Sequence, residues 1–181
     1  MRYCIKKNII IMKIFNHLLI ICLLGFIACD GEVTEDATDK KEEINPYDLE
    51  KLATIDRAII REYANLQADM TFDSTESGIF YHIENPGIGD PPTDTSTVTV
   101  NYTLYLVDGT LIESTEMKSE PSTFEVGNVI DGWQESLKLL GVTGNGTFVI
   151  PSGLGYGLRR VNGMPHNAIL VFDIEILSIM D

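Results

Sequence analysis

Two long stretches in which apolar and polar residues alternate constrain the fold of this chain most strongly. The first ends at the dipeptide Asp108-Gly109, and the second, ILVFDIEILSI, lies near the C-terminus. Every second side chain of a β-strand lies on the same face, so each stretch predicts a strand with one buried face. Asp-Gly is typical of a tight hairpin turn. The residues expected on the buried faces are Val98, Val100, Tyr102, Leu104 and Leu106 in the first strand, and Leu170, Phe172, Ile174 and Ile176 in the second.

Shorter elements complete an α+β domain. Short apolar runs bounded by glycine, proline and aspartate predict three further strands, at Ile79–Ile83, Phe124–Val126 and Thr147–Ile150. The segment Asp131–Leu140 (DGWQESLKLL) predicts a short helix that buries Trp133, Leu137 and Leu140. Together these elements predict an antiparallel five- to six-stranded sheet wrapped around the short helix, within residues 76–181.

A second helix is expected upstream of this domain. Apolar residues recur at spacings of three and four after Asn45-Pro46, which is typical of an amphipathic helix. We assign residues 47–75 to this N-terminal helical extension. Its apolar face is expected to pack against the following domain, and a dimerisation helix is the alternative. The apolar positions are Leu49, Leu52, Ile55, Ile59, Tyr63 and Leu66.

The N-terminal residues 1–28 have the pattern of a secretory signal peptide. A basic start precedes the apolar run LLIICLLGFIA, which is too short to span about 30 Å of hydrocarbon at 1.5 Å per residue. Met12-Lys13 offers an alternative start with the same pattern. The three cysteines of the chain are Cys4, Cys22 and Cys29, so the part after Cys29 can form no internal disulfide.

Cys29 is the predicted site of lipidation. The sequence Phe26-Ile27-Ala28-Cys29 resembles a bacterial lipobox, although Phe26 stands where leucine is usual. The apolar pattern changes abruptly after Cys29 to DGEVTEDATDKKEE, as expected where a lipid anchor gives way to a tether. Each buried acyl CH₂ contributes about 0.8 kcal/mol to membrane binding. The alternatives are an ordinary signal peptide with an incidental cysteine and an uncleaved anchor.

The charge of the chain excludes some partners. Its formal net charge is −14, and only nine of its 13 basic residues follow Cys29, against all 27 acidic residues. A nucleic-acid partner is not expected, because phosphate binding requires clustered Lys and Arg. Residues 29–46 are acidic with almost no large apolar side chains, and we expect them to form a disordered tether.

The sequence lacks the residues that several kinds of catalysis require. After Cys29 the chain holds only two histidines, His82 and His166, and it has no GxSxG, HExxH or phosphate-binding glycine loop. We therefore expect no nucleophilic, zinc or nucleotide chemistry, and no cofactor or metal. The acidic residues Asp90, Asp94 and Asp108 lack calcium-loop spacing and are expected to be solvated turn residues.

A series of residues in a fixed order narrows the possible function. These are Tyr102, Asp108-Gly109, the VIDGW block ending at Trp133, Ile150-Pro151, Gly155-Tyr156-Gly157, Pro165 and the AILVFDIEIL block containing Phe172. In order and spacing they resemble FKBP-type peptidyl-prolyl cis-trans isomerases over about residues 97–179. The signal peptide, tether and leading helix look like the bacterial lipoprotein members of that family, some of which are associated with gliding motility.

The resemblance implies a pocket that grips the proline ring of a substrate, with Trp133 as its floor. The Ile130 N–H and the Tyr156 hydroxyl would each bind a substrate carbonyl. Residues with implied catalytic roles are Tyr102, Glu113, Ile130, Trp133, Tyr156 and Phe172. Residues with implied substrate contacts are Ile112, Phe124, Val129, Met164 and Leu170. Ile112 and Ser122 stand where the family commonly has aromatic residues, Glu113 where it usually has Asp, and the loop 158–164 has no clear counterpart.

The sequence therefore predicts an exported prolyl isomerase in the bacterial cell envelope, anchored to the outer membrane through Cys29 on its periplasmic or surface face. Its expected partners are proline-containing polypeptides whose folding it assists. A non-catalytic proline-peptide binding or chaperone module on the same fold is the main alternative. A surface adhesin acting through the acidic tether is a third.

Overall fold

The computed structural model describes residues 46–159, 161 and 163–181. The predicted signal peptide, Cys29 and nearly all of the acidic tether lie outside the described residues. Within the described part, no helix has the length and apolar character needed to cross a membrane.

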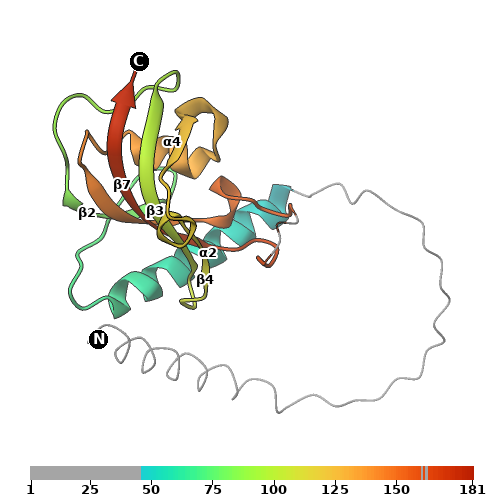
Figure 1. Ribbon diagram of the computed structural model, residues 1–181. Helices are drawn as coiled ribbons and strands as arrows, with labels where there is room; N and C mark the ends of the chain where they lie inside the picture. The colour runs from blue at the N-terminus through green and yellow to red at the C-terminus, as the bar shows by residue number, and fades with distance from the viewer. Residues whose placement is uncertain (1–45, 160, 162) are drawn as a thin grey trace, which may run out of the picture. The chain divides into compact units, whose positions relative to one another are not determined.

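The domain is built on one antiparallel seven-stranded sheet, in the order β1-β2-β6-β7-β3-β4, with β5 also paired to β3 (Figure 1). The predicted α+β class is confirmed. The strand count is seven rather than five or six because β1 and β4 also pair into the sheet. The strands are β1 (Asp73–Ser74), β2 (Phe80–Asn85), β3 (Thr97–Leu106), β4 (Leu111–Ser114), β5 (Ser122–Glu125), β6 (Asn145–Ile150) and β7 (Leu170–Met180).

Helices lie on both sides of the sheet. The long helix α2 spans Pro46–Leu66, and α4 spans Asp131–Leu137. The shorter elements are α3 (Thr115–Lys118) and the 3-10 helices η1 (Val126–Asn128) and η2 (Ser152–Leu154). Helix α2 ends at Leu66, and β1 follows, so the last part of the expected helical extension contributes to the sheet.

One edge of β3 is shared by two short strands. β5 pairs with the first half of β3, and β4 pairs with its second half. Between them, the chain leaves the sheet as α3. The Thr115 hydroxyl lies 3.0 Å from the Tyr102 backbone nitrogen and accepts its N–H, so a side chain replaces the missing strand partner. The sheet consequently ends in β1, β4 and β5, which are only two, four and four residues long.

The main core lies between the sheet and α4. Leu104 of β3 and Phe148 of β6 both pair with Phe172 of β7, so the three side chains form a row on one face. Trp133 and Leu137 are one helical turn apart on α4 and pack against this face. The predicted buried residues Trp133, Leu137 and Leu140 are 5%, 0% and 0% exposed.

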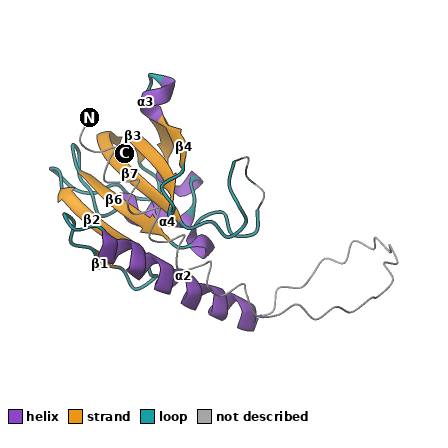
Figure 2. Ribbon diagram, turned by 90° about the horizontal axis from the view of Figure 1, so that it is seen from below, coloured by secondary structure: helices purple, strands orange, loops and turns teal. Residues whose placement is uncertain are grey.

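The opposite face of the sheet is covered by α2, which runs along it in Figure 2. Ile60 of α2 packs with Val149, Ile169 and Val171. The predicted packing of this helix on the domain is found, and Tyr63 lies in the contact as expected. Part of the predicted face is wrong, because Ile55 and Ile59 are 46% and 40% exposed while Asp56 and Ile60 are 3% and 0% exposed. The carboxylate of Asp56, which the apolar pattern did not place on this face, accepts two hydrogen bonds from Ser152 of the domain.

Candidate active site

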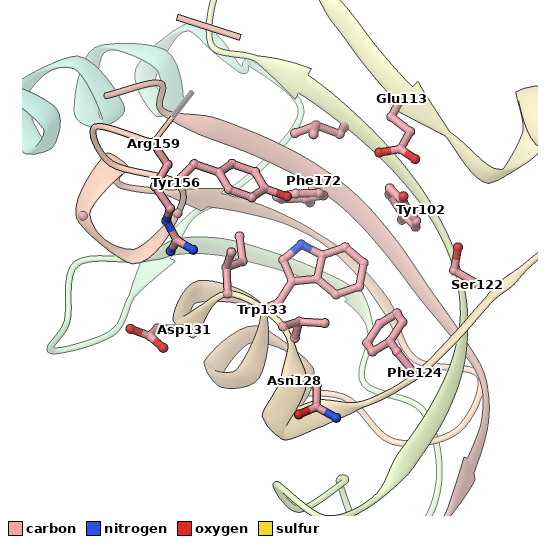
Figure 3. Close-up of a pocket in the computed structure, with 15 residues that line it drawn as sticks. Tyr102, Glu113, Ser122, Phe124, Asn128, Asp131, Trp133, Tyr156, Arg159 and Phe172 are labelled. Carbon is pink, nitrogen blue, oxygen red and sulfur yellow. The ribbon is translucent and has the colours of Figure 1, made fainter. Parts of the chain in front are cut away.

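A pocket of about 500 Å³ opens between α4, the sheet and the loop that follows η2. Figure 3 shows that its side chains converge from separate elements around the indole of Trp133. β3, β4, β5 and β7 supply one side, and the segments around η1, α4 and η2 supply the other. The lining residues are Tyr102, Leu104, Glu113, Ser122, Phe124, Asn128, Val129, Ile130, Asp131, Trp133, Gly153, Gly155, Tyr156, Arg159 and Phe172.

Aromatic rings form the floor. Trp133 is only 5% exposed, yet it lines the open pocket. The centroids of Phe172, Tyr102 and Phe124 lie 5.0, 5.1 and 5.3 Å from the Trp133 centroid, each in an edge-to-face geometry. Edge-to-face pairs at such distances stabilise ring packing beyond area burial. The floor is therefore apolar and held rigidly from three sides.

A polar group interrupts the apolar wall. The Tyr102 hydroxyl interacts with the Glu113 carboxylate and with the Ser122 hydroxyl. Desolvation, followed by the hydrogen bond to Glu113, raises the pKa of Tyr102 above its ordinary value. Lys118 contacts the carboxylate of Glu113 from the solvent side. The hydrogen bond from Lys118 and a weaker one from Tyr102 outweigh desolvation and lower the pKa of Glu113. Glu113 therefore stays ionised at neutral pH.

This arrangement predicts how Glu113 titrates. Its carboxyl pKa in the folded protein, followed by carbon-13 NMR, should lie below the ordinary value of 4.5. Because the folded-state pKa is lowered, the stabilisation is present above the ordinary pKa and is lost as the pH falls through the folded one. Lys118→Gln should move the pKa of Glu113 back up.

The ion pair between Lys138 and Asp94 provides the control for this titration. Lys138→Gln removes a pair with a 2.5 Å contact that involves neither Glu113 nor Tyr102, so it should leave the pKa of Glu113 in place. Since the side chains of Lys118 and Glu113 are 47% and 36% exposed, high salt should weaken the effect of Lys118. An unchanged Glu113 pKa in Lys118→Gln would contradict the arrangement.

A backbone donor lies at the start of α4. Ile130 precedes the helix, and its carbonyl accepts the N–H groups of Trp133 and Gln134 at 2.9 and 3.2 Å. The Gln134 side-chain amide donates to the Val129 carbonyl at 2.8 Å and thereby fixes the preceding segment. Within the described residues, the Ile130 N–H has no hydrogen-bond acceptor. It is therefore available to a carbonyl group in the pocket.

Tyr156 supplies a second donor. It lies between Gly155 and Gly157, and both glycine N–H groups donate to the Ser152 carbonyl, at 3.1 and 3.0 Å. Gly157 has φ +53, a left-handed conformation that a side chain would strain. Figure 3 shows the Tyr156 ring reaching over the pocket toward Phe172 and Trp133. No acceptor for its hydroxyl is found in the part of the chain that the structure describes.

The structure brings eight of the eleven predicted pocket residues to the pocket and places three elsewhere. Ile112 and Met164 are half-buried and pack against the core without lining the pocket. Leu170 is fully buried. The turn after η2 packs closely against it, since a Cβ built at Gly155 would lie only 3.0 Å from Leu170 Cδ1. The eight that line it are Tyr102, Glu113, Phe124, Val129, Ile130, Trp133, Tyr156 and Phe172.

Other lining residues were not predicted as site residues. Leu104 lies opposite Glu113 in the β3–β4 strand pair, and both line the pocket. The alternation of β3 and its pairing with β4 could therefore have predicted Leu104 as a lining residue. Asn128 and Asp131 flank Val129 and Ile130 and could have been inferred from that proximity. Arg159 lies in the loop 158–164, where the resemblance offered no counterpart. It brings a positive charge to the pocket.

Metal ligation finds no support among residues 46–159, 161 and 163–181. They contain no group of three or more His, Cys, Asp or Glu side chains placed to hold a metal ion.

A sheet wrapped around one short helix, with an aromatic pocket floored by the tryptophan of that helix, is the arrangement expected of an FKBP-like fold. The sequence model of the FKBP-type peptidyl-prolyl cis-trans isomerase family matches residues 89–177. Over these residues the chain is similar to that family.

Two of three relatives similar to this chain are named as isomerases. The chain is 44% identical to an FKBP-type peptidyl-prolyl cis-trans isomerase FkpA of Aeromonas hydrophila, over 59% of this chain and 40% of that protein. It is 36% identical to FkpA of Escherichia coli K12, over 72% of this chain and 49% of that protein. It is 41% identical to the outer membrane protein MIP of Legionella longbeachae, over 57% of this chain and 45% of that protein.

Solved structures agree with the fold. The crystal structure of FkpA from Escherichia coli matches with a TM-score of 0.63 and 36% identity, covering 74% of this chain and 63% of that one. A peptidyl-prolyl cis-trans isomerase from Pseudomonas syringae matches with a TM-score of 0.62 and 25% identity, covering 73% of this chain and 96% of that one. The chain spans about half the length of the curated relatives that it matches, 40% of the first and 49% of the second.

Proposed function

We propose that this chain is a peptidyl-prolyl cis-trans isomerase that assists the folding of exported envelope proteins. The observation that carries this proposal is the open pocket floored by Trp133 and packed by three aromatic rings. The match of residues 89–177 to the family model and the names of the relatives support it. In this assignment Trp133, Tyr102 and Phe172 grip the proline ring, while Ile130 and Tyr156 bind the flanking chain.

The mechanism follows from the physics of the peptide bond. Rotation about the C–N bond has a barrier of about 18–20 kcal/mol because the planar amide is stabilised by resonance. The two isomers of an X-Pro bond differ by only about 0.5–1 kcal/mol, so the enzyme must change the rate rather than the equilibrium. The twisted amide is less polar than the planar one. An apolar pocket therefore favours the twisted form relative to the ground state.

Hydrogen bonds complete this mechanism. The Ile130 N–H and the Tyr156 hydroxyl are the donors that hold substrate carbonyls on either side of the rotating bond. Lowering the barrier by about 4–7 kcal/mol would give roughly a thousandfold to hundred-thousandfold acceleration. No proton transfer or covalent intermediate is needed.

A direct assay tests this function. The purified chain at micromolar concentration should accelerate cis-trans exchange of an Xaa-Pro peptide, measured by NMR exchange spectroscopy without an auxiliary protease. A rate equal to the uncatalysed rate would overturn the enzyme assignment.

A non-catalytic proline-binding module is the second candidate. Ser122 lines the pocket where the family commonly has an aromatic residue, so this side is wider and more polar. The binding module predicts that the peptide changes the fluorescence of Trp133 while the exchange rate stays uncatalysed. Saturable binding together with catalysis would exclude it.

We further propose that the chain is exported by residues 1–28, anchored through a lipid on Cys29 and tethered by residues 29–46, with the isomerase domain at 76–181. The lipobox-like sequence before Cys29 and the acidic residues after it support this organisation. Its clients would be proline-containing polypeptides of the envelope. Mass spectrometry of the mature N-terminus should find an acylated Cys29, and Cys29→Ala should release the protein from the membrane fraction.

A further inference from the structure

Helix α2 makes a direct polar contact with the loop that carries Tyr156. The Asp56 side chain of α2 is 3% exposed, and Ser152, at the start of η2, is fully buried. Ser152 donates to Asp56 Oδ2 twice, through its backbone N–H at 2.8 Å and its hydroxyl at 2.6 Å. These residues are 96 positions apart in the sequence. A buried carboxylate is costly unless such donors compensate for lost hydration, so the contact is specific.

Asp56 supplies a cap that η2 lacks. The residue before η2 is Pro151, which makes no capping hydrogen bond with its side chain. The first N–H groups of a short helix need acceptors from outside the helix. The carboxylate of Asp56 provides one of them from another element, and thereby fixes where η2 begins.

Ser152 also binds the turn that carries Tyr156. Its carbonyl accepts the N–H groups of Gly155 and Gly157, the two neighbours of Tyr156. Gly153 and Gly155 themselves line the pocket. The N–H and hydroxyl of Ser152 therefore bind α2, while its carbonyl binds the turn that carries Tyr156.

We propose that Asp56 is a positioning residue for the isomerase reaction, and that α2 contributes to catalysis by supplying it. This inference rests on the proposed function of the pocket. Asp56 touches no substrate and acts through Ser152 on Tyr156. It also lies outside residues 89–177, which match the family.

The test compares Asp56→Ala with Ile60→Val, a change on the same buried face of the same helix. Ile60 packs on the sheet without contacting the Tyr156 loop, so Ile60→Val should lower the melting temperature and leave kcat/KM near that of the wild type. Asp56→Ala should lower kcat/KM about tenfold or more, because small misplacements of a catalytic group are costly. Asp56→Asn keeps an oxygen that accepts from Ser152 and should restore most of the activity.

A measurement independent of activity completes the test. Hydrogen exchange of the Gly155 and Gly157 amides, measured on the full chain by NMR, should accelerate in Asp56→Ala and stay slow in Ile60→Val. If Asp56→Ala fails to fold, Ser152→Ala serves instead, because it removes only the hydroxyl donor, and it should give an intermediate effect on both readouts.

The outcomes separate the two proposals. An inactive wild type overturns the isomerase function, whereas the exchange rates still decide whether Asp56 orders the loop. Unchanged exchange at Gly155 and Gly157 in Asp56→Ala overturns the positioning role. So does a loss of activity that follows the loss of stability equally in Asp56→Ala and Ile60→Val.

Discussion

Trp133→Ala should reduce kcat/KM for an Xaa-Pro peptide by about a hundredfold or more. The indole is the floor of the pocket and packs edge-to-face with Tyr102, Phe124 and Phe172. Its removal takes away the surface that favours the twisted amide and lets the three rings relax. A loss of about 3 kcal/mol in transition-state stabilisation corresponds to this factor. Peptide exchange measured at several substrate concentrations would give the value.

Leu137→Ala is the matched control for this variant. Leu137 lies one turn after Trp133 on α4, is fully buried and does not line the pocket. Either truncation should lower the free energy of unfolding by about 2–5 kcal/mol. Only Trp133→Ala should lower kcat/KM of the folded protein. Equal losses of activity in the two variants would contradict the assignment of Trp133 as the pocket floor.

Gly87→Ala should be the most destabilising glycine substitution in the turn before β3. Gly87 has φ +79, and a Cβ there would lie 2.6 Å from the backbone nitrogen of Gly144 and 2.7 Å from the carbonyl of Gly141. Backbone atoms cannot move aside as a flexible side chain can. Overpacking and the strained φ together should lower the free energy of unfolding by about 3 kcal/mol or more. Urea unfolding would measure it.

Gly89→Ala separates the effect of the close backbone contact from the effect of the positive φ. Gly89 has φ +76, close to that of Gly87, but nothing lies within 4 Å of its Cβ position. The expected loss is therefore about 1 kcal/mol, from backbone strain alone. Similar losses at the two positions would show that the turn does not pack against the segment after α4 as the structure has it.

The long elements were predictable from the sequence because their patterns extend over many residues. The alternation of β3 and β7 gave both their positions and their buried faces, and the spacing of Trp133 and Leu137 gave α4. The two-residue β1 carries no pattern of its own and exists only through pairing with β2. The burial of Asp56 on α2 was missed because an apolar pattern does not predict a buried carboxylate, and its partner Ser152 is distant in the sequence.

The pocket was predictable to the extent that the resemblance supplied it. Eight implied residues line the pocket, but their catalytic and binding roles await the experiments above. Leu170 shares the inward face of β7 with Phe172, and strand alternation cannot show that the turn at Gly155 covers one and leaves the other open. The contribution of Arg159 depends on a loop conformation that no local pattern encodes.

The short outer strands of the sheet bear on how the domain avoids aggregation with unfolded chains. An incompletely folded polypeptide can add itself as an extra strand wherever a sheet offers a long row of unpaired amides and carbonyls. Here β1, β4 and β5 offer two, four and four residues. Another chain could form only a few ladder bonds along any of these three strands. They are therefore poor templates for the growth of an aggregate.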